Sequence, residues 1–193
     1  NLLHVDSGTH YRALTLLFLN LSGKPSGNNS ITDFLYQIKF ESILSGRSAL
    51  IKTNGVVPSD KDLRGPDVNA MVSHLAAMPK LRELLNEYQR SLPDFAQAHG
   101  FDGIIMEGRD IGTIIFPQAD FKFFLFADEK TRMKRRADEG IQDSIAKRDK
   151  IDSSRKIAPL ACAQDAKSID NSNLTPEEVV DEICAIIENR AGQ

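Results

Sequence analysis

Residues 4–14, HVDSGTHYRAL, decide the fold class, because an apolar strand-like run ends here and a helical pattern begins. The apolar residues before Asp6 predict a short strand, and the leucines after Tyr11 recur at helical spacing. The polar residues between them are typical of a helix N-terminus, with Asp6 or Ser7 as the capping residue. Capping does not explain Arg12, because a cation in the first turns lies at the unfavourable end of the helix dipole. We therefore expect Arg12 to bind an anion.

Strand-like and helix-like segments alternate along the rest of the chain. The stretches DGIIMEGRD (102–110) and FKFFLFAD (121–128) each predict a buried strand. Residues 66–92 predict two helical segments, with Pro79 near the start of the second. Residues Thr175 to Glu178, with Pro176 between them, predict a capping box and the start of a last helix. Such alternation predicts an α/β fold in which a parallel sheet is covered by helices on both faces. Residues 31–60 differ, because their short alternating runs DFLYQIKFES, RSALIKTN and GVVPSD predict a small inserted antiparallel meander.

Composition excludes several classes of protein. The chain has 193 residues and a formal net charge of -3, so it lacks the overall positive charge of a nucleic-acid-binding protein. Its two cysteines show neither a disulfide framework nor metal-ligand spacing, which indicates a reduced interior. The longest mainly apolar stretch, ALTLLFLNL (13–21), is much shorter than the roughly 20 residues that cross a bilayer. We expect a cytoplasmic protein that binds neither membranes nor nucleic acid.

Polar clusters follow two of the predicted strands, and the carboxyl ends of parallel strands are where α/β sheets bind ligands. DSG follows the strand LLHV, and EGRD follows the strand GIIM. We therefore expect one crevice to be lined by Asp6, Ser7, Arg12, Glu107, Arg109 and Asp110.

More arginines follow in the sequence, at positions 132, 135, 136, 148 and 155. Between residues 128 and 160 there are ten Lys and Arg against seven Asp and Glu, a local charge of +3. Any one of these residues fits a solvated helix face with ion pairs equally well. As a set they favour phosphoryl transfer, because arginines from separate segments stabilise a phosphoryl group in flight.

Four motifs in this order and spacing resemble those of the bacterial cytidylate kinases: VDSGTHYR (5–12), EGRDIGT (107–113), RMKRR (132–136) and KRDKIDSSRKIAPL (147–160). The similarity extends from Asn1 to the last predicted helix. It implies a P-loop nucleoside monophosphate kinase that transfers the γ-phosphoryl group of ATP to CMP or dCMP. It also implies that Mg²⁺ accompanies ATP, that the partners are small nucleotides, and that the protein is a monomer.

The same resemblance implies domain boundaries. The meander corresponds to the insertion in the family's monophosphate-binding domain. The implied parts are a core (1–22), the monophosphate-binding domain (23–98), more core (99–128), a short lid (129–150) and the C-terminal core (151–193).

The resemblance also implies roles for individual residues. Ser7 and Arg12 match the segment that holds the CMP phosphate, and Arg109 and Asp110 match the acceptor-side pair of GRD. Ser73 and Arg82 match residues that read the cytosine ring. The remaining matches are Arg148, Asp152 and Arg155 around ribose and phosphate, and Arg132 and Arg136 in the lid over ATP. The implied catalytic set is Arg12, Arg109, Asp110, Arg132 and Arg136.

Simpler roles exist for several of these residues. Ser73 fits a small helix residue, Arg82 fits an exposed helix cation, and Asp152 fits a helical ion pair with Arg155. Glu107, at a strand end, suits a Mg²⁺ site through water, or it anchors Arg109. Only Arg109 has little structural reason to be there, because its charged Gly-Arg-Asp turn lies between two apolar strands.

The chain departs from the family pattern at one essential element. It contains no G-x-x-x-x-G-K-[ST] segment to bind the donor phosphates: Gly23-Lys24 is preceded by Phe18 and followed by Pro25 at the deciding positions. We expect the loop to precede Asn1, and we expect the 193 residues to be inactive without it. The alternatives are a non-catalytic nucleotide-binding protein that truly lacks the loop, and a sibling kinase for UMP, AMP or shikimate.

Overall fold

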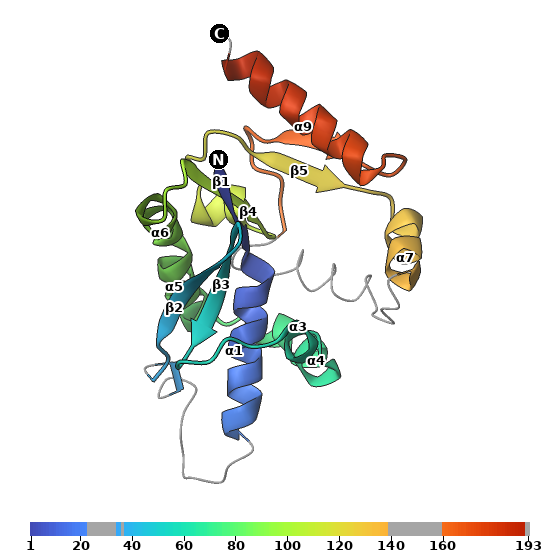
Figure 1. Cartoon of the computed structure of the whole chain (residues 1–193). Coiled ribbons are helices and arrows are strands. Elements are labelled where there is room, and N and C mark those ends of the chain that lie inside the picture. The colour runs from blue at the N-terminus through green and yellow to red at the C-terminus, as the bar shows by residue number, and fades with distance from the viewer. Residues whose placement is uncertain (23–33, 36, 139–159, 192–193) are drawn as a thin grey trace. The chain divides into compact units, whose positions relative to one another are not determined.

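The computed structural model describes residues 1–22, 34–35, 37–138 and 160–191 (Figure 1). By its internal contacts the chain divides into two compact units, unit 1 (Asn1–Arg109) and unit 2 (Asp110–Gln193). The two units are described separately below.

Unit 1 is built on a mixed sheet of four strands (Figure 1). The strands are β1 (Leu2–Asp6), β2 (Phe40–Ser45), β3 (Ser48–Thr53) and β4 (Gly103–Glu107), in the order β2-β3-β1-β4. β1 is parallel to both of its neighbours, β3 and β4, and only β2 runs antiparallel. The carboxyl ends of β1 and β4 therefore meet at one edge, as the alternating pattern predicts.

Helices follow the strands of unit 1. They are α1 (Ser7–Ser22), α3 (Asp60–Leu63), α4 (Pro66–Leu75), α5 (Pro79–Arg90) and α6 (Leu92–Ala98). Pro66 and Pro79 occupy the first helical positions of α4 and α5, where the missing N–H costs no hydrogen bond. The predicted helix start near Pro79 is confirmed.

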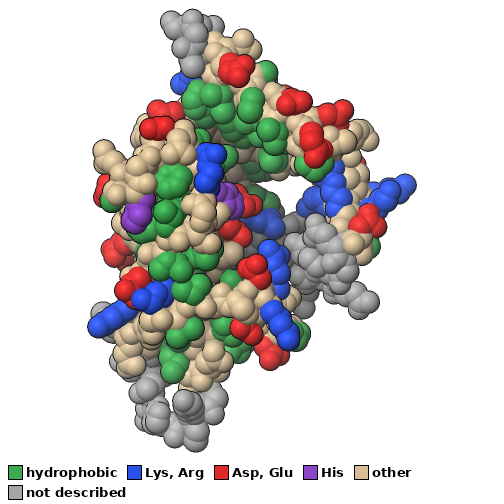
Figure 2. Space-filling view, in the orientation of Figure 1, with side chains coloured by type: hydrophobic (Ala, Val, Ile, Leu, Met, Phe, Trp, Pro, Cys, Tyr) green, Lys and Arg blue, Asp and Glu red, His purple; other side chains and the backbone are tan. Residues whose placement is uncertain are grey.

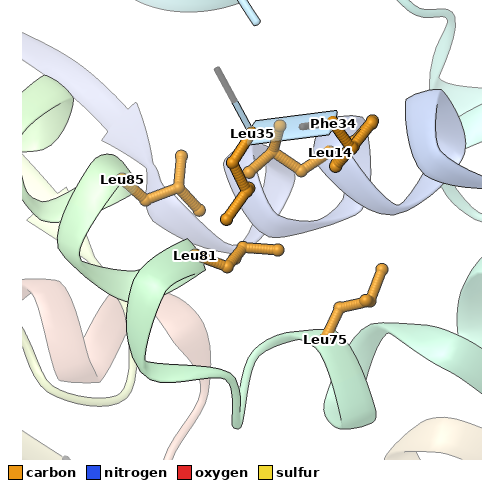
Figure 3. Packing of buried hydrophobic residues seen from close by; sticks show 6 residues of the cluster. All are labelled: Leu14, Phe34, Leu35, Leu75, Leu81 and Leu85. Carbon is orange, nitrogen blue, oxygen red and sulfur yellow. The ribbon is translucent and has the colours of Figure 1, made fainter. Parts of the chain in front are cut away.

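The helices bury one face of this sheet. Leu3 and Val5 of β1 and Ala49 of β3 pack against Leu92 and Ala96 of α6. Farther along α1, Leu14 meets leucines of α4 and α5 together with Phe34 and Leu35 in a second cluster (Figure 3). Burying one leucine completely contributes roughly 1.5–3 kcal/mol, so these clusters hold α1 firmly against α4 and α5.

The opposite face of the sheet carries exposed apolar side chains. Leu2 is 42% exposed, Ile105 54% and Leu50 39%. Within unit 1 the described helices cover one face of the sheet, and the prediction of helices on both faces is not confirmed.

The predicted meander is a two-stranded hairpin within the described residues. β2 and β3 pair in full antiparallel register around the turn at Gly46, whose φ of 59° favours glycine. Phe34 and Leu35, in the first of the three predicted runs, are helical instead of extended. Their burial in the core outweighs the alternating pattern, and the third run contributes only a single bridge between Thr53 and Val56.

Unit 2 contains a second, two-stranded parallel sheet. β5 (Phe123–Phe126) pairs with β6 (Lys167–Asp170), and the helices are α7 (Glu129–Asp138) and α9 (Pro176–Ala191). The stretch after Asp110 forms a short π-helical turn, Ile111–Ile115, which the sequence pattern does not indicate. Figure 2 shows hydrophobic side chains at the surface beside α9.

The helix start predicted at Thr175 is confirmed, whereas the predicted burial of β5 is not. Thr175 N–H donates to the Glu178 carboxylate at 2.7 Å, and Glu178 N–H donates to Thr175 Oγ1 at 3.2 Å, which is a complete capping box. In β5, Leu125 and Phe126 are exposed, and among the described residues β5 pairs with β6 alone. None of the helices in the described part of the chain has the length and apolar character needed to span a bilayer.

Candidate functional site

The junction between β1 and α1 has no connecting loop, because β1 ends at Asp6 and α1 begins at Ser7. The Asp6 carboxylate accepts the backbone N–H of Gly8 at 2.8 Å and that of Thr9 at 3.3 Å. Asp6 is therefore the capping residue of α1, and a carboxylate there also suits the positive end of the helix dipole. A Cβ on Gly8 would lie 3.0 Å from Asp6 Oδ1, so glycine allows the cap its close approach.

The carboxyl end of β4 lies beside this junction, as predicted. Asp6 and Glu107 are directly opposed in the parallel register. The Ser7 hydroxyl donates to the Glu107 backbone carbonyl at 2.7 Å, and His4 Nε2 lies 3.0 Å from Glu107 Oε1. Ser7 is buried, whereas the Glu107 side chain is 66% exposed. The structure thus brings Asp6, Ser7 and Glu107 together at one sheet edge.

Arg12 lies on α1 about one and a half turns beyond this edge and reaches the α3–α4 segment. Its Nη1 donates to the Leu63 carbonyl oxygen at 3.0 Å and to Asn69 Oδ1 at 2.6 Å. Both of these acceptors are neutral, and they hold Arg12 in a half-buried position.

The two predicted cytosine-reading residues are both buried in the helical layer of unit 1. Ser73 lies on α4 and Arg82 on α5, with 6% and 3% of each residue exposed. Arg82 Nη1 donates to the Ala76 carbonyl oxygen at 3.0 Å, and its guanidinium lies 5.4 Å from the centre of the Tyr11 ring. The simpler reading of Arg82 as an exposed helix cation is wrong. A guanidinium stacked on an aromatic ring and bonded to a carbonyl keeps a fixed plane.

A buried histidine lies on the same helix, two residues before Arg12. His10 is fully buried, its Nδ1 is 3.3 Å from Gln89 Nε2, and its ring packs edge-on to Tyr88. Burial lowers the pKa of His10 to about 4. The imidazole is therefore neutral in the folded protein at neutral pH.

The GRD pair falls at the boundary between the two units. Arg109 is half-buried and ends unit 1. Asp110 is buried and begins unit 2, where its backbone carbonyl accepts the N–H groups of Ile114 and Ile115 at the start of the π-helical turn.

The two predicted lid arginines lie in unit 2. Arg132 is half-buried on α7, and Arg136 belongs to the same helix. Arg135, one residue earlier, is bound to the side chain and carbonyl of Asn171 and to the carbonyl of Leu174, which indicates a structural role. The predicted ribose and phosphate group, Arg148, Asp152 and Arg155, lies outside the described residues.

The carboxylates at the sheet edge are of the ligand type that Mg²⁺ prefers. The described residues hold no group of three or more His, Cys, Asp or Glu side chains placed to bind a metal. Mg²⁺ usually keeps several waters and binds through one or two carboxylates together with substrate phosphates. The exposed Glu107 carboxylate fits that role, and His4 is the neighbour that orients it.

Sequence reasoning missed three residues that shape this site: Asn69, which binds Arg12; Tyr11, which stacks on Arg82; and His4, which contacts Glu107. An asparagine in the first turn of a helix, or an aromatic residue on an apolar helix face, is common in any fold. Asn69 and Tyr11 contact the site residues only because α1 packs against α4 and α5.

A family model described as cytidylate kinase matches residues 1–189. A cytidylate kinase of Clostridium botulinum (strain Loch Maree / Type A3) is 36% identical over 202 residues, covering 97% of this chain and 86% of that protein. One of Limosilactobacillus reuteri (strain DSM 20016) is 36% identical and is covered over 84% of its length. One of Anoxybacillus flavithermus (strain DSM 21510 / WK1) is also 36% identical, with 85% covered.

Proposed function

The chain belongs to the cytidylate kinase family, and we propose that unit 1 holds the acceptor nucleotide, CMP or dCMP, for phosphoryl transfer from ATP. Members of this family are ATP-dependent nucleoside monophosphate kinases. The observation that carries the proposal is the fixed Arg12, which lies on the helix that starts at the β1–β4 edge. An immobilised guanidinium beside strand ends suits a phosphate dianion.

The acceptor's base is read by Ser73 and Arg82 in this proposal. Cytosine offers an acceptor at N3 and a donor at N4, whereas uracil reverses both. Arginine only donates, so Arg82 facing N3 favours cytosine and leaves uracil with an unsatisfied donor. The buried position of Arg82, its bond to the Ala76 carbonyl and its contact with Tyr11 support this role, because a fixed fork discriminates better than a mobile one.

In this proposal Arg109 and Asp110 act on the acceptor side, and Arg132 and Arg136 belong to the lid over ATP. The arginines neutralise the transferring group, and Mg²⁺ bound with ATP would supply further charge stabilisation for it. Glu107 would hold that ion through water. The 193 residues contain no G-x-x-x-x-G-K-[ST] segment, and we propose that this chain alone does not transfer the phosphoryl group.

The finer fold is also part of this proposal. The chain adopts a P-loop nucleoside monophosphate kinase architecture with a short lid at 129–150. The hairpin β2–β3 belongs to a monophosphate-binding domain that spans 23–98. Ribose and phosphate are contacted by Arg148, Asp152 and Arg155.

Calorimetric titration of the chain with CMP and with UMP tests the acceptor site. We expect CMP to bind about 10- to 100-fold more tightly than UMP, since one unpaired buried polar group costs about 1–3 kcal/mol. Arg82→Ala should reduce this ratio. Lys80→Ala removes an exposed positive charge from the same helix and should leave the ratio unchanged.

The alternative function is a non-catalytic nucleotide-binding protein that truly lacks the donor loop. A chain that binds CMP and ATP equally well, with no dependence on Arg82, would support that alternative. Equal affinity for CMP and UMP would refute the proposed cytosine pocket.

A further inference from the structure

Asn69 lies on α4 in contact with Arg12, and none of the motifs that mark the family includes it. We propose that Asn69 is a positioning residue, which holds the Arg12 guanidinium in the orientation that contacts the acceptor's phosphate. This inference rests on the proposed function of Arg12.

The contact fixes the plane of the guanidinium. Both bonds to the α3–α4 segment leave from the same nitrogen, Nη1, and reach Asn69 Oδ1 at 2.6 Å and the Leu63 carbonyl at 3.0 Å. Nη1 carries two hydrogens, so each bond uses one of them. Two acceptors at different positions around one nitrogen of a planar group determine the direction of the whole fork.

The amide of Asn69 is itself held in one orientation. Its Nδ2 donates to the Arg64 carbonyl oxygen at 2.8 Å, and its backbone N–H donates to the Gly65 carbonyl oxygen at 2.9 Å. A carbonyl oxygen only accepts hydrogen bonds, so the NH₂ group of the amide must face Arg64. The side-chain oxygen consequently faces Arg12, and the two bonds form one relay from the end of α3 to α1.

A neutral acceptor is the suitable choice at this position. A carboxylate would also accept from Arg12, and in a half-buried site it would form a close ion pair. That pair would cancel the charge that attracts the phosphate. The asparagine amide accepts from Arg12 as a carboxylate would, but it adds no negative charge beside the guanidinium.

Two substitutions separate positioning from simple structural support. Asn69→Ala removes both bonds of the relay, and Asn69→Asp keeps an acceptor for Arg12 but adds a negative charge. Ser59→Ala is the matched control, because it removes the side-chain cap of α3 at 3.2 Å without touching Arg12. Binding of CMP and of cytidine, which has the same base and sugar but no phosphate, is measured for each variant by calorimetry, and thermal unfolding is recorded in parallel.

We expect Asn69→Ala to weaken CMP binding by about tenfold, the equivalent of about 1.4 kcal/mol, and to leave cytidine binding within about twofold. Asn69→Asp should weaken CMP binding at least as much, although it unfolds at no lower temperature than Asn69→Ala. Ser59→Ala should bind both ligands like the unmodified chain.

The outcomes distinguish this inference from the proposed function. Failure of the unmodified chain to bind CMP overturns the acceptor site and this inference with it. If the unmodified chain binds CMP and both Asn69 variants bind it equally well, only the role of Asn69 is overturned. Equal weakening of CMP and cytidine binding also overturns the role of Asn69. General damage to the fold would affect both ligands, whereas loss of a phosphate contact would affect only CMP. If Asn69→Ala does not fold, Asn69→Asp decides alone: weaker binding of CMP with unchanged binding of cytidine supports the role of Asn69, and unchanged binding of CMP overturns it.

Discussion

Acidification should destabilise unit 1 through His10. This residue is fully buried, and its pKa is lowered to about 4 by burial, from an ordinary value of 6.5. Between these two values the unfolded chain binds a proton that the folded chain excludes. The contribution of neutral His10 to stability is therefore complete above pH 6.5 and is lost as the pH falls from 6.5 towards 4.

The magnitude follows from the two pKa values. Between pH 7.5 and pH 5, the free energy of unfolding should fall by about 2 kcal/mol through this residue alone. The carboxylates whose pKa is lowered, such as Asp128 and Asp170, contribute little over this interval, because even unfolded aspartates titrate near pH 4. A loss of about 2 kcal/mol is a large part of the stability of an ordinary domain.

Urea unfolding, monitored by tyrosine fluorescence, measures this effect in unit 1. The chain has no tryptophan, and its three tyrosines, at positions 11, 36 and 88, all belong to unit 1. His10→Phe keeps a ring of similar size beside Tyr88 but cannot titrate. Between pH 7.5 and pH 5 its free energy of unfolding should therefore fall by about 2 kcal/mol less than that of the unmodified chain. His74→Asn, at an exposed position of α4, is the control and should behave like the unmodified chain. An equal loss with and without His10 would refute the reasoning.

Three further outcomes are expected. Arg12→Ala and Arg109→Ala should each weaken CMP binding by about 10- to 100-fold, since a charge-assisted phosphate contact contributes about 1.5–3 kcal/mol; loss of folding with unchanged binding in the remaining folded fraction would assign them a structural role. The 193-residue chain mixed with ATP, CMP and Mg²⁺ should form no CDP in a coupled or chromatographic assay, and steady turnover would contradict this. Thr175→Ala should lower the free energy of unfolding of unit 2 by about 0.5–2 kcal/mol, measured by circular dichroism, and no change would show that the capping box contributes nothing.

Local sequence signals predicted the parts of the fold that depend on neighbouring residues. The junction at Asp6, the proline at position 79 and the capping box at Thr175 are each set by backbone hydrogen bonding within a few residues, and all three are confirmed. The alternating pattern at 33–42 misled, because burial of Phe34 and Leu35 against α1 depends on contacts far along the chain.

The candidate site, too, could be predicted from the sequence only in part. Motif spacing predicted that Ser7 and Glu107 share one sheet edge, since parallel strands place their ends together. The partner of Arg12 was not predictable, because Asn69 lies 57 positions away on a helix whose packing only the fold determines. The burial of Arg82 was missed for the same reason, because a charged residue flanked by Lys80 and Glu83 is typical of an exposed helix face.

The direct passage from β1 into α1 has a consequence for how the chain tolerates change over evolution. Each helical residue turns the chain by about 100° and advances it by about 1.5 Å. One residue inserted after Asp6 would rotate Tyr11 and Arg12 away from α5 and α4, and one deletion would rotate them the other way. Connecting loops ordinarily absorb such length changes, but here strand and helix adjoin. The number of residues between Asp6 and Arg12 is therefore fixed.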